Sequence, residues 1–154
     1  MHSPGATHAR ITDTFFHAFE KSIKAYRQFA QTRIDESGFG ITVDQWLVLK
    51  ALQESPDATQ QQIGTMVFKD FASITRIIRL LVAKGFVRRS THSKDGRRSA
   101  LCLSRSGDDV ISALEPISRE SRRQALLGTT PADVARARAV LEMVASNCLR
   151  REPA

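Results

Sequence analysis

The sequence has 154 residues, of which 42% are hydrophobic and 25% are charged, and it carries a formal net charge of +7. This length suits one domain with a substantial hydrophobic core, so a single domain over residues 1–154 is expected. No apolar run approaches the roughly 20 residues that cross a bilayer, and the first nine residues lack the layout of a secretory signal. These features argue against a membrane-spanning or secreted protein. The two cysteines, Cys102 and Cys148, lie far apart without metal-ligand spacing, which suits a reducing compartment and predicts a cytoplasmic protein.

The positive charge is concentrated in one segment. Between Lys69 and Arg105 there are ten basic residues but only two acidic ones, Asp70 and Asp95, so this segment carries more than the net charge of the whole chain. Such a density of charge is an electrostatic footprint for a polyanion. The alternative interpretation is a basic face that only meets solvent.

The first part of the chain is predicted to be helical. From Arg10 to Ile34 apolar residues recur at spacings of three and four, which predicts a long amphipathic helix that ends before the glycines at 38 and 40. Two capping boxes follow, Thr42–Gln45 and Thr59–Gln62, and each predicts the start of a helix. The helix that Thr42 opens is dense in apolar residues, so we expect it at the centre of the core.

The next helix, from Phe71 to Lys84, divides its residues by chemistry. At 100° per residue, its isoleucines and Leu81 fall on one side, while Ala72, Arg76, Arg79 and Ala83 fall on the other. A short turn joins this helix to the preceding one. Two helices joined in this way, of which the second exposes small and basic residues, predict a helix-turn-helix that binds DNA.

Beyond Gly85 the hydrophobic period changes. Residues 86–91 and 100–103 are predicted to be two short strands, joined across the turn pair Asp95–Gly96. A hairpin with a basic tip directly after a helix-turn-helix predicts a winged helix. Two further helices follow, one from Ser104 to about Leu127 and one from Thr130 onward. The predicted fold is therefore mainly α with a small β-wing: a winged helix-turn-helix lobe and a helical dimerisation region.

Three motifs carry a resemblance to a known family: Leu81-Val82-Ala83-Lys84-Gly85-Phe86-Val87-Arg88-Arg89, Asp95-Gly96-Arg97-Arg98 and Leu101-Cys102-Leu103-Ser104-Arg105-Ser106-Gly107. Together they resemble the MarR (multiple antibiotic resistance regulator) family of bacterial transcriptional regulators, over roughly the whole chain. Ser104 stands where the family has Thr and keeps the capping hydroxyl. Val82 stands where the family often has Glu.

The resemblance implies a repressor that binds a pseudo-palindromic operator in double-stranded DNA and is released by a small aromatic ligand. Residues 42–104 would form the DNA-binding lobe, with Asp95 orienting Arg97 toward the minor groove. The residues expected to contact DNA are Lys69, Ala72, Ser73, Thr75, Arg76, Arg79, Lys94, Asp95, Arg97 and Arg98.

The resemblance also implies a homodimer. Residues 10–36 and 105–150 would form its helical dimerisation region. The last helix supports this expectation by itself, because alone it has too few partners to bury its apolar seam. The residues expected at the dimer interface are Ile11, Phe15, Ile111, Leu114, Val140, Leu141 and Val144.

An effector pocket is predicted where relatives place one, between the dimerisation helices and the DNA-binding lobe. The residues proposed to line it are Phe16, His17, Phe39, Trp46 and Phe68, although aromatic residues at such spacing are also typical of a core. The sequence has no catalytic, phosphate-cradling or metal-binding motif. We therefore expect neither an enzyme nor a cofactor or metal site.

Three alternatives remain open at this stage. A sequence-independent architectural DNA-binding protein needs the basic segment but not the groove-reading helix. A protein-interaction module would use the basic face on an acidic partner. A redox-responsive regulator would use Cys102, although its place in a strand, like that of Cys148 in an apolar seam, favours a structural cysteine.

Overall fold

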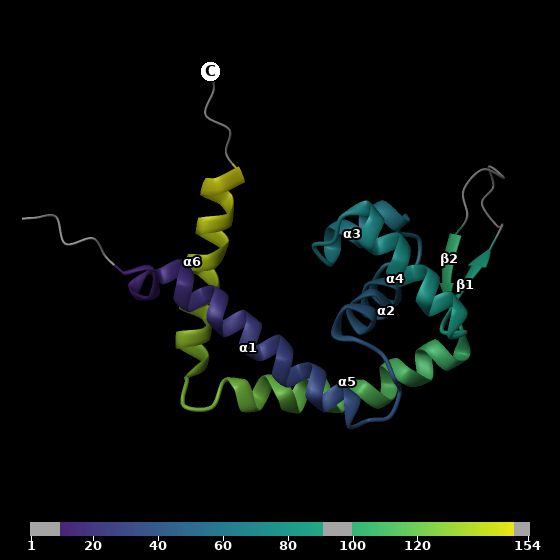
Figure 1. Ribbon diagram of the computed structural model, residues 1–154, viewed down its shortest axis with the longest axis horizontal. Coiled ribbons are helices and arrows are strands. Elements are labelled where there is room, and N and C mark those ends of the chain that lie inside the picture. The colour runs from purple at the N-terminus through teal and green to yellow at the C-terminus, as the bar shows by residue number, and fades with distance from the viewer. Residues whose placement is uncertain (1–9, 91–99, 150–154) are drawn as a thin grey trace, which may run out of the picture. The chain divides into compact units, whose positions relative to one another are not determined.

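The computed structural model describes residues 10–90 and 100–149. Contacts within the chain group it into two units, Met1–Ser121 and Arg122–Ala154. The described elements, labelled in Figure 1, are η1 (Ile11–Asp13), α1 (Phe15–Asp35), α2 (Val43–Glu54), α3 (Gln60–Met66), α4 (Phe71–Ala83), β1 (Val87–Ser90), β2 (Ala100–Leu103), α5 (Arg105–Ala125) and α6 (Pro131–Leu149). The mainly helical fold with a two-stranded hairpin is as predicted. None of these described helices is long and apolar enough to cross a membrane.

The chain enters α1 differently from the prediction. A short 3-10 turn precedes the helix, and Thr14 separates the two with extended backbone. Its side chain accepts a hydrogen bond from the backbone N–H of His17, at 3.2 Å. This N-cap satisfies an otherwise free amide, so α1 begins at Phe15 rather than at Arg10.

Both predicted capping boxes are present. Thr42 accepts from the backbone of Gln45 at 3.1 Å, while the Gln45 side chain accepts from the backbone of Thr42 at 3.1 Å. Thr59 and Gln62 make the same reciprocal pair at the start of α3, at 3.2 and 2.8 Å. The two boxes set where α2 and α3 begin, as the sequence indicates.

Local hydrogen bonds determine where helix α4 begins and ends. Asp70 caps its start by accepting from the backbone N–H of Ser73, at 2.7 Å. At its other end Gly85 has φ of 76°, and the N–H groups of Gly85 and Phe86 donate to the carbonyls of Val82 and Leu81. This is a Schellman motif, which turns the chain directly from the helix into β1.

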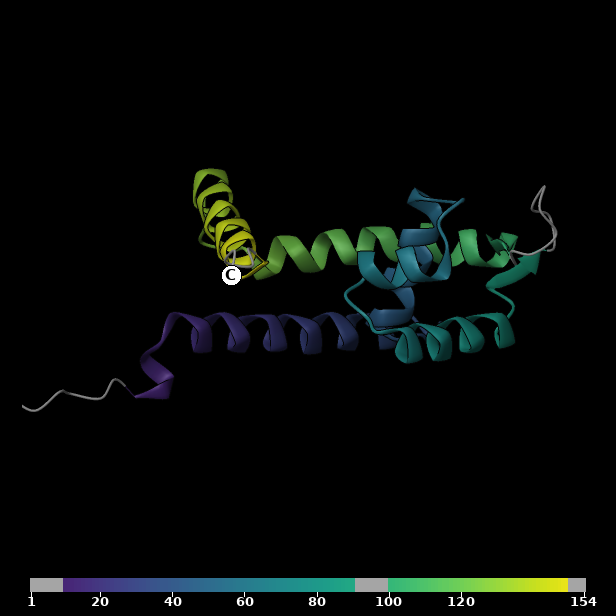
Figure 2. The ribbon, with the colours of Figure 1, turned by 90° about the horizontal axis from the view of Figure 1, so that it is seen from above.

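The hairpin pairs β1 and β2 antiparallel, with Val87 opposite Leu103 and Arg88 opposite Cys102. Val87 and Leu101 are buried, so one face of the ribbon joins the core. Ser104 closes its base: the Ser104 N–H donates to the Phe86 carbonyl at 3.0 Å, and the hydroxyl donates to the Gly85 carbonyl at 2.6 Å. The hairpin is thereby tied to the end of α4, beside which it lies in Figures 1 and 2.

The core of the first unit is built around α2, as predicted. Val48, Leu49 and Leu52 are completely or almost completely buried there. α4, α5 and the hairpin contribute the other main contacts. The buried residues from these elements are Ile74, Ile78, Leu81, Val87, Leu101, Val110, Ile111 and Leu114.

Helix α6 belongs to the second unit and has no buried residue. Its predicted apolar seam consists of Val134, Ala137, Leu141, Val144 and Cys148. This seam is only partly covered, because Val134, Leu141 and Val144 are half-buried and the remaining residues of the helix are exposed. A helix with an apolar seam gains little stability while that seam faces water.

Candidate nucleic-acid interface

The outer face of α4 carries the small and basic residues that the sequence places there. Ala72, Arg76, Arg79 and Ala83 are exposed, opposite the buried Ile74, Ile78 and Leu81. Within residues 10–90 and 100–149 neither arginine forms an ion pair, so both guanidinium groups are available to an anion. Arginine is suited to guanine edges and to phosphate oxygens because its donors form a planar fork.

Two other residues predicted to contact DNA, Ser73 and Thr75, already form hydrogen bonds within the subunit. The Ser73 hydroxyl donates to the Asp70 carboxylate at 3.0 Å. The Thr75 hydroxyl donates to the Phe71 carbonyl at 2.7 Å and accepts from the Gln60 amide at 2.5 Å. A hydroxyl has a single hydrogen to donate. In this arrangement Ser73 and Thr75 therefore have no donor left for a base.

Lys69, also predicted to contact DNA, takes part in an ion cluster. Its ammonium group lies 2.9 Å from the Asp44 carboxylate, which also pairs with Arg27 of α1. Partial burial raises the pKa of Asp44, but the hydrogen bonds and charges of Lys69 and Arg27 outweigh burial and leave that pKa below its usual value. Lys69 thus holds the turn between α3 and α4 against the start of α2.

Two aromatic residues at this turn are exposed, although neither is predicted from the sequence to lie at the surface. Phe68 is 94% exposed, and its backbone has φ of 56°, in the left-handed region that residues other than glycine rarely adopt. Phe71, the first residue of α4, is 69% exposed. The sequence does contain a signal for the exposure of Phe71. This residue directly follows the capping residue Asp70, and so lies at the end of the helix, beyond the turns that pack on the core.

The hairpin adds basic residues from its first strand. Arg88 and Arg89 are both exposed on β1. The predicted tip contacts Lys94, Asp95, Arg97 and Arg98 lie outside the described residues. The predicted brace of Arg97 by Asp95 therefore stays a prediction.

The predicted dimer contacts fall into two groups. Ile111 and Leu114 are only 2% and 1% exposed, because they pack into the core of their own chain. Their assignment to the dimer interface is wrong, since a side chain covered by its own subunit has no surface left for another. By contrast, Ile11, Phe15 and Val140 are exposed, and Leu141 and Val144 are half-exposed.

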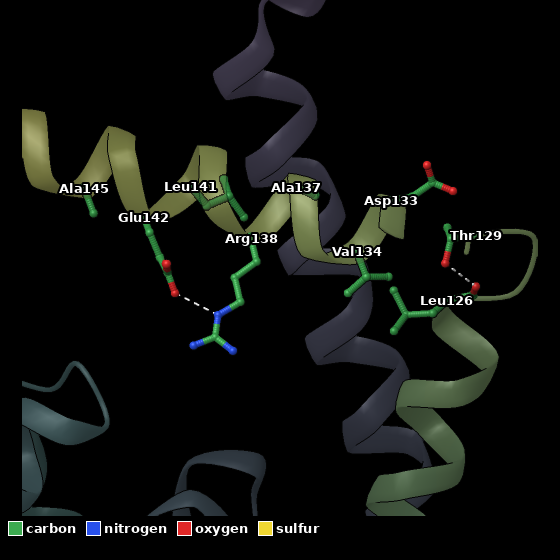
Figure 3. Close-up of a pocket in the computed structure, with 9 residues that line it drawn as sticks. All are labelled: Leu126, Thr129, Asp133, Val134, Ala137, Arg138, Leu141, Glu142 and Ala145. Atoms are coloured by element: carbon green, nitrogen blue, oxygen red, sulfur yellow. Dashed lines mark hydrogen bonds and ion pairs between the residues drawn. The ribbon is translucent and has the colours of Figure 1, made fainter. Parts of the chain in front are cut away.

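A shallow groove follows α6 within the second unit. Its floor is mainly apolar and includes Leu126, Val134, Ala137 and Leu141. Figure 3 shows Arg138 beside it, donating to Glu142 at 2.7 Å. The groove coincides with the predicted seam, and hence with an apolar surface that nothing in residues 122–149 covers.

The five residues predicted to line the effector pocket do not converge within one subunit. Phe16 and His17 lie at the start of α1, whereas Phe39 follows its end, and a helix of this length separates them by roughly 30 Å. Trp46 is 7% exposed and belongs to the core, while Phe68 projects into solvent. None of the five residues lines the groove along α6.

The two cysteines, Cys102 and Cys148, are both free and exposed in the single subunit. Cys102 is therefore not the packed structural cysteine that its place in a strand indicates. Cys148 lies on α6, whose apolar seam a second subunit would cover, so its structural role stays a prediction. Cys102 is on the solvent side of β2, since the buried Leu101 precedes it and side chains alternate along a strand. Among residues 10–90 and 100–149 no group of His, Cys, Asp and Glu is placed to hold a metal ion.

Comparison with known proteins finds a family match for part of the chain. Residues 41–99 match the model of the MarR family. The HTH-type transcriptional repressor IacR of Pseudomonas putida is 25% identical over 146 residues, which are 95% of this chain and 86% of that protein.

Solved structures have the same fold. The chain resembles Bordetella bronchiseptica BpsR, whose DNA binding is regulated by 6-hydroxynicotinic acid, with a TM-score of 0.79 and 17% identity over 93% of this chain and 99% of that one. It resembles S. aureus MepR in complex with DNA with a TM-score of 0.78 and 20% identity, over 90% of this chain and 99% of that one. Residues 41–99 thus match the MarR family, and the fold of the chain is similar to that of solved proteins such as MepR.

Proposed function

We propose that this regulator is a homodimeric repressor, which binds a pseudo-palindromic operator and releases it when a small aromatic compound binds. The observation that carries the proposal is the outer face of α4, where Arg76 and Arg79 are exposed between the small residues Ala72 and Ala83. Small residues permit close approach to the floor of a groove, and the two arginines supply donors for bases and phosphates.

Each subunit would use two elements on the DNA. α4 would enter the major groove, and the hairpin would follow the backbone, with Arg97 at its tip in the adjacent minor groove, where the potential of narrow sequences is most negative. Lys94, Asp95 and Arg98 would complete the tip. A two-fold dimer would place its half-sites about one helical turn, or about 10 bp, apart.

The homodimer is supported by apolar side chains that remain uncovered on each unit. Ile11 and Phe15 are exposed before and at the start of α1. On α6, Val140, Leu141 and Val144 are exposed or half-exposed. A second subunit that covers these residues would remove apolar surface from water, the main driving force of association.

Release by a ligand is supported by the relatives. IacR is a repressor, and BpsR responds to 6-hydroxynicotinic acid, a small aromatic acid. The corresponding mechanism here is a ligand that binds one dimer geometry better than another and so changes the separation of the two α4 helices. Because the predicted pocket residues do not converge in one subunit, such a pocket would require both subunits or other residues.

Selection of DNA from a random pool, followed by competition with small aromatic acids and phenols, tests the proposal. We expect a two-fold symmetric sequence to be enriched and to be bound in a salt-dependent manner. Arg97→Ala is expected to weaken binding and flatten its salt dependence, while the dimer stays intact. Equal affinity for selected and random DNA would instead indicate an architectural DNA-binding protein. An absence of salt-dependent DNA binding would favour the protein-interaction module.

A second candidate, a redox-responsive regulator, is favoured by the exposed thiol of Cys102 on the strand opposite Arg88. Oxidation of a thiol beside the DNA-binding surface would add polar or negative groups there. Treatment with hydrogen peroxide should then reduce operator binding by the wild type but not by Cys102→Ser, with Cys148→Ser as the matched control. If wild type and Cys102→Ser respond alike, Cys102 is not the sensor.

A further inference from the structure

The first turn of the recognition helix exposes an apolar surface. Phe71, the first residue of α4, is 69% exposed, and Ala72 beside it is exposed as well. Side chains on a helix point toward its N-terminus, so a side chain at the first position extends past the end of the helix. In a helix-turn-helix, this end of the recognition helix contacts the edges of the bases.

The polar groups of the same turn are already engaged. The hydroxyl hydrogens of Ser73 and Thr75 are donated to the Asp70 carboxylate and the Phe71 carbonyl. The backbone N–H of Ser73 is also donated to Asp70. A phosphate approaching this end would therefore meet the Asp70 carboxylate, which repels it. Beside that carboxylate, the side chains of Phe71 and Ala72 present an apolar surface to a ligand.

The major groove of DNA has only one apolar group, the C5 methyl of thymine, and aromatic side chains pack against it. We propose that Phe71 is a specificity-determining residue that packs on the C5 methyl group of one thymine in each operator half-site. This inference rests on the operator binding proposed above, and it specifies that one position of each half-site is a thymine. Arg76 and Arg79, further along the same helix, are left to contact guanine or phosphate.

Replacement of thymine by deoxyuridine tests the inference, because it removes only the methyl group. Once selection has given the operator, each thymine is replaced in turn, symmetrically in both half-sites. The affinity of the wild-type protein is then measured by fluorescence anisotropy at fixed salt. We expect one thymine per half-site at which the replacement weakens binding about fourfold per methyl group, the effect of uncovering one buried carbon.

A variant then identifies the side chain that contacts the methyl group. Phe71→Ala should bind the thymine and deoxyuridine operators equally, because the packing partner is gone. Leu80→Ala removes another exposed apolar residue of α4, nearer its C-terminal end, and should keep the full discrimination. Since Phe71 is largely exposed, its replacement should leave the thermal unfolding midpoint nearly unchanged, which circular dichroism would verify.

The failure of this inference is distinguishable from failure of the proposed function. An enriched operator that tolerates deoxyuridine at every position would overturn the role of Phe71 and leave repression intact. Discrimination that persists in Phe71→Ala would assign the methyl contact to another residue and have the same consequence. If selection enriches no sequence, operator binding itself is absent, and the inference is overturned together with the proposed function.

Discussion

The Lys69 ammonium lies 2.9 Å from the Asp44 carboxylate and joins the start of α2 to the turn that precedes the recognition helix. Arg27 of α1 pairs with the same carboxylate. One acidic side chain therefore connects three segments of the first unit. Each of the three side chains is partly exposed. Water and salt therefore weaken the attraction within these ion pairs, but less than they would for pairs of fully exposed side chains.

Asp44→Asn is expected to destabilise the fold by about 1–2 kcal/mol near pH 7, since it removes the charge from two ion pairs. Chemical denaturation monitored by circular dichroism measures this loss. Asp57→Asn, which changes an exposed aspartate in the loop before α3, is the matched control and should be nearly neutral. Equal stability of Asp44→Asn and wild type would show that the cluster contributes nothing.

The same cluster predicts a dependence on pH. The pKa of Asp44 is lower in the folded state than in the unfolded state, so the unfolded chain binds the proton more tightly. The stability that Asp44 contributes is complete above its ordinary pKa of about 3.9, and it is lost as the pH falls through the lower folded-state pKa. In Asp44→Asn, stability should fall less steeply below about pH 4.

Arg76 is expected to read a base. Arg76→Ala should cost about 1–3 kcal/mol of operator binding and relax the preference at one position of each half-site. Binding to a panel of single-base operator variants measures this effect. Arg136→Ala replaces an exposed arginine of α6 and should preserve the preference at every position. A uniform loss of affinity over all variants would instead assign Arg76 to a phosphate.

Leu141 is expected to lie at the dimer interface. Leu141→Asp would bury a carboxylate against the apolar side chains of a second subunit, so it should dissociate the dimer. Sedimentation equilibrium measures the mass of the species. Ala135→Asp introduces the same group at an exposed position of α6 outside the seam and should remain dimeric. A Leu141→Asp protein that is still a dimer would place the interface elsewhere.

Gly107 permits α5 to approach the end of α4. A methyl group at this position would overlap the carbonyl oxygen of Phe86, which belongs to the backbone and has little freedom to move. Gly107→Ala should therefore lower the free energy of unfolding by several kcal/mol, at the large end of single substitutions. Ser112→Ala introduces alanine at an exposed site of the same helix and should change stability by less than about 0.5 kcal/mol. A thermal melt that matches the wild type for Gly107→Ala would contradict the packing.

The capping box of α3 is a further test. Thr59→Ala should cost about 1 kcal/mol, because the free amide of Gln62 would lose its acceptor. Thr32→Ala, at an exposed position inside α1, should be neutral or slightly stabilising, since alanine is the better helix former. Denaturant titration of both variants compares the two values directly. Equal stabilities would mean that the box is dispensable.

The sequence predicts the elements well wherever a signal is local. The boxes at Thr42 and Thr59 and the turn at Gly85 involve residues within a few positions of one another, so their pattern is visible in the chain. The 3-10 turn before Phe15 is less visible, because Thr14 lies inside an apolar period that continues across it.

The site is less predictable because it depends on contacts between distant segments. The apolar stripe of α5 indicates a covered face but does not say what covers it, and Ile111 and Leu114 are covered by their own subunit. Likewise, a wheel projection shows Ser73 and Thr75 at accessible angles but does not reveal that Asp70 and Gln60 already bind their hydroxyls. Phe71, which we propose to contact a thymine, is not singled out by the sequence for a related reason, since hydrophobic residues are ordinarily assigned to the core.

The connection between α4 and the hairpin has a consequence for regulation. The Schellman turn at Gly85 fixes the direction in which β1 leaves the helix, and Ser104 ties the base of the hairpin back to Gly85 and Phe86. These hydrogen bonds couple the end of α4 to the base of the hairpin, and we expect the two to move together as one lever. A ligand that tilts this lever would leave the register within a half-site unchanged and alter only the spacer between half-sites. Operators that differ in spacer length should therefore distinguish the ligand-bound from the ligand-free protein, whereas changes inside a half-site should affect both equally.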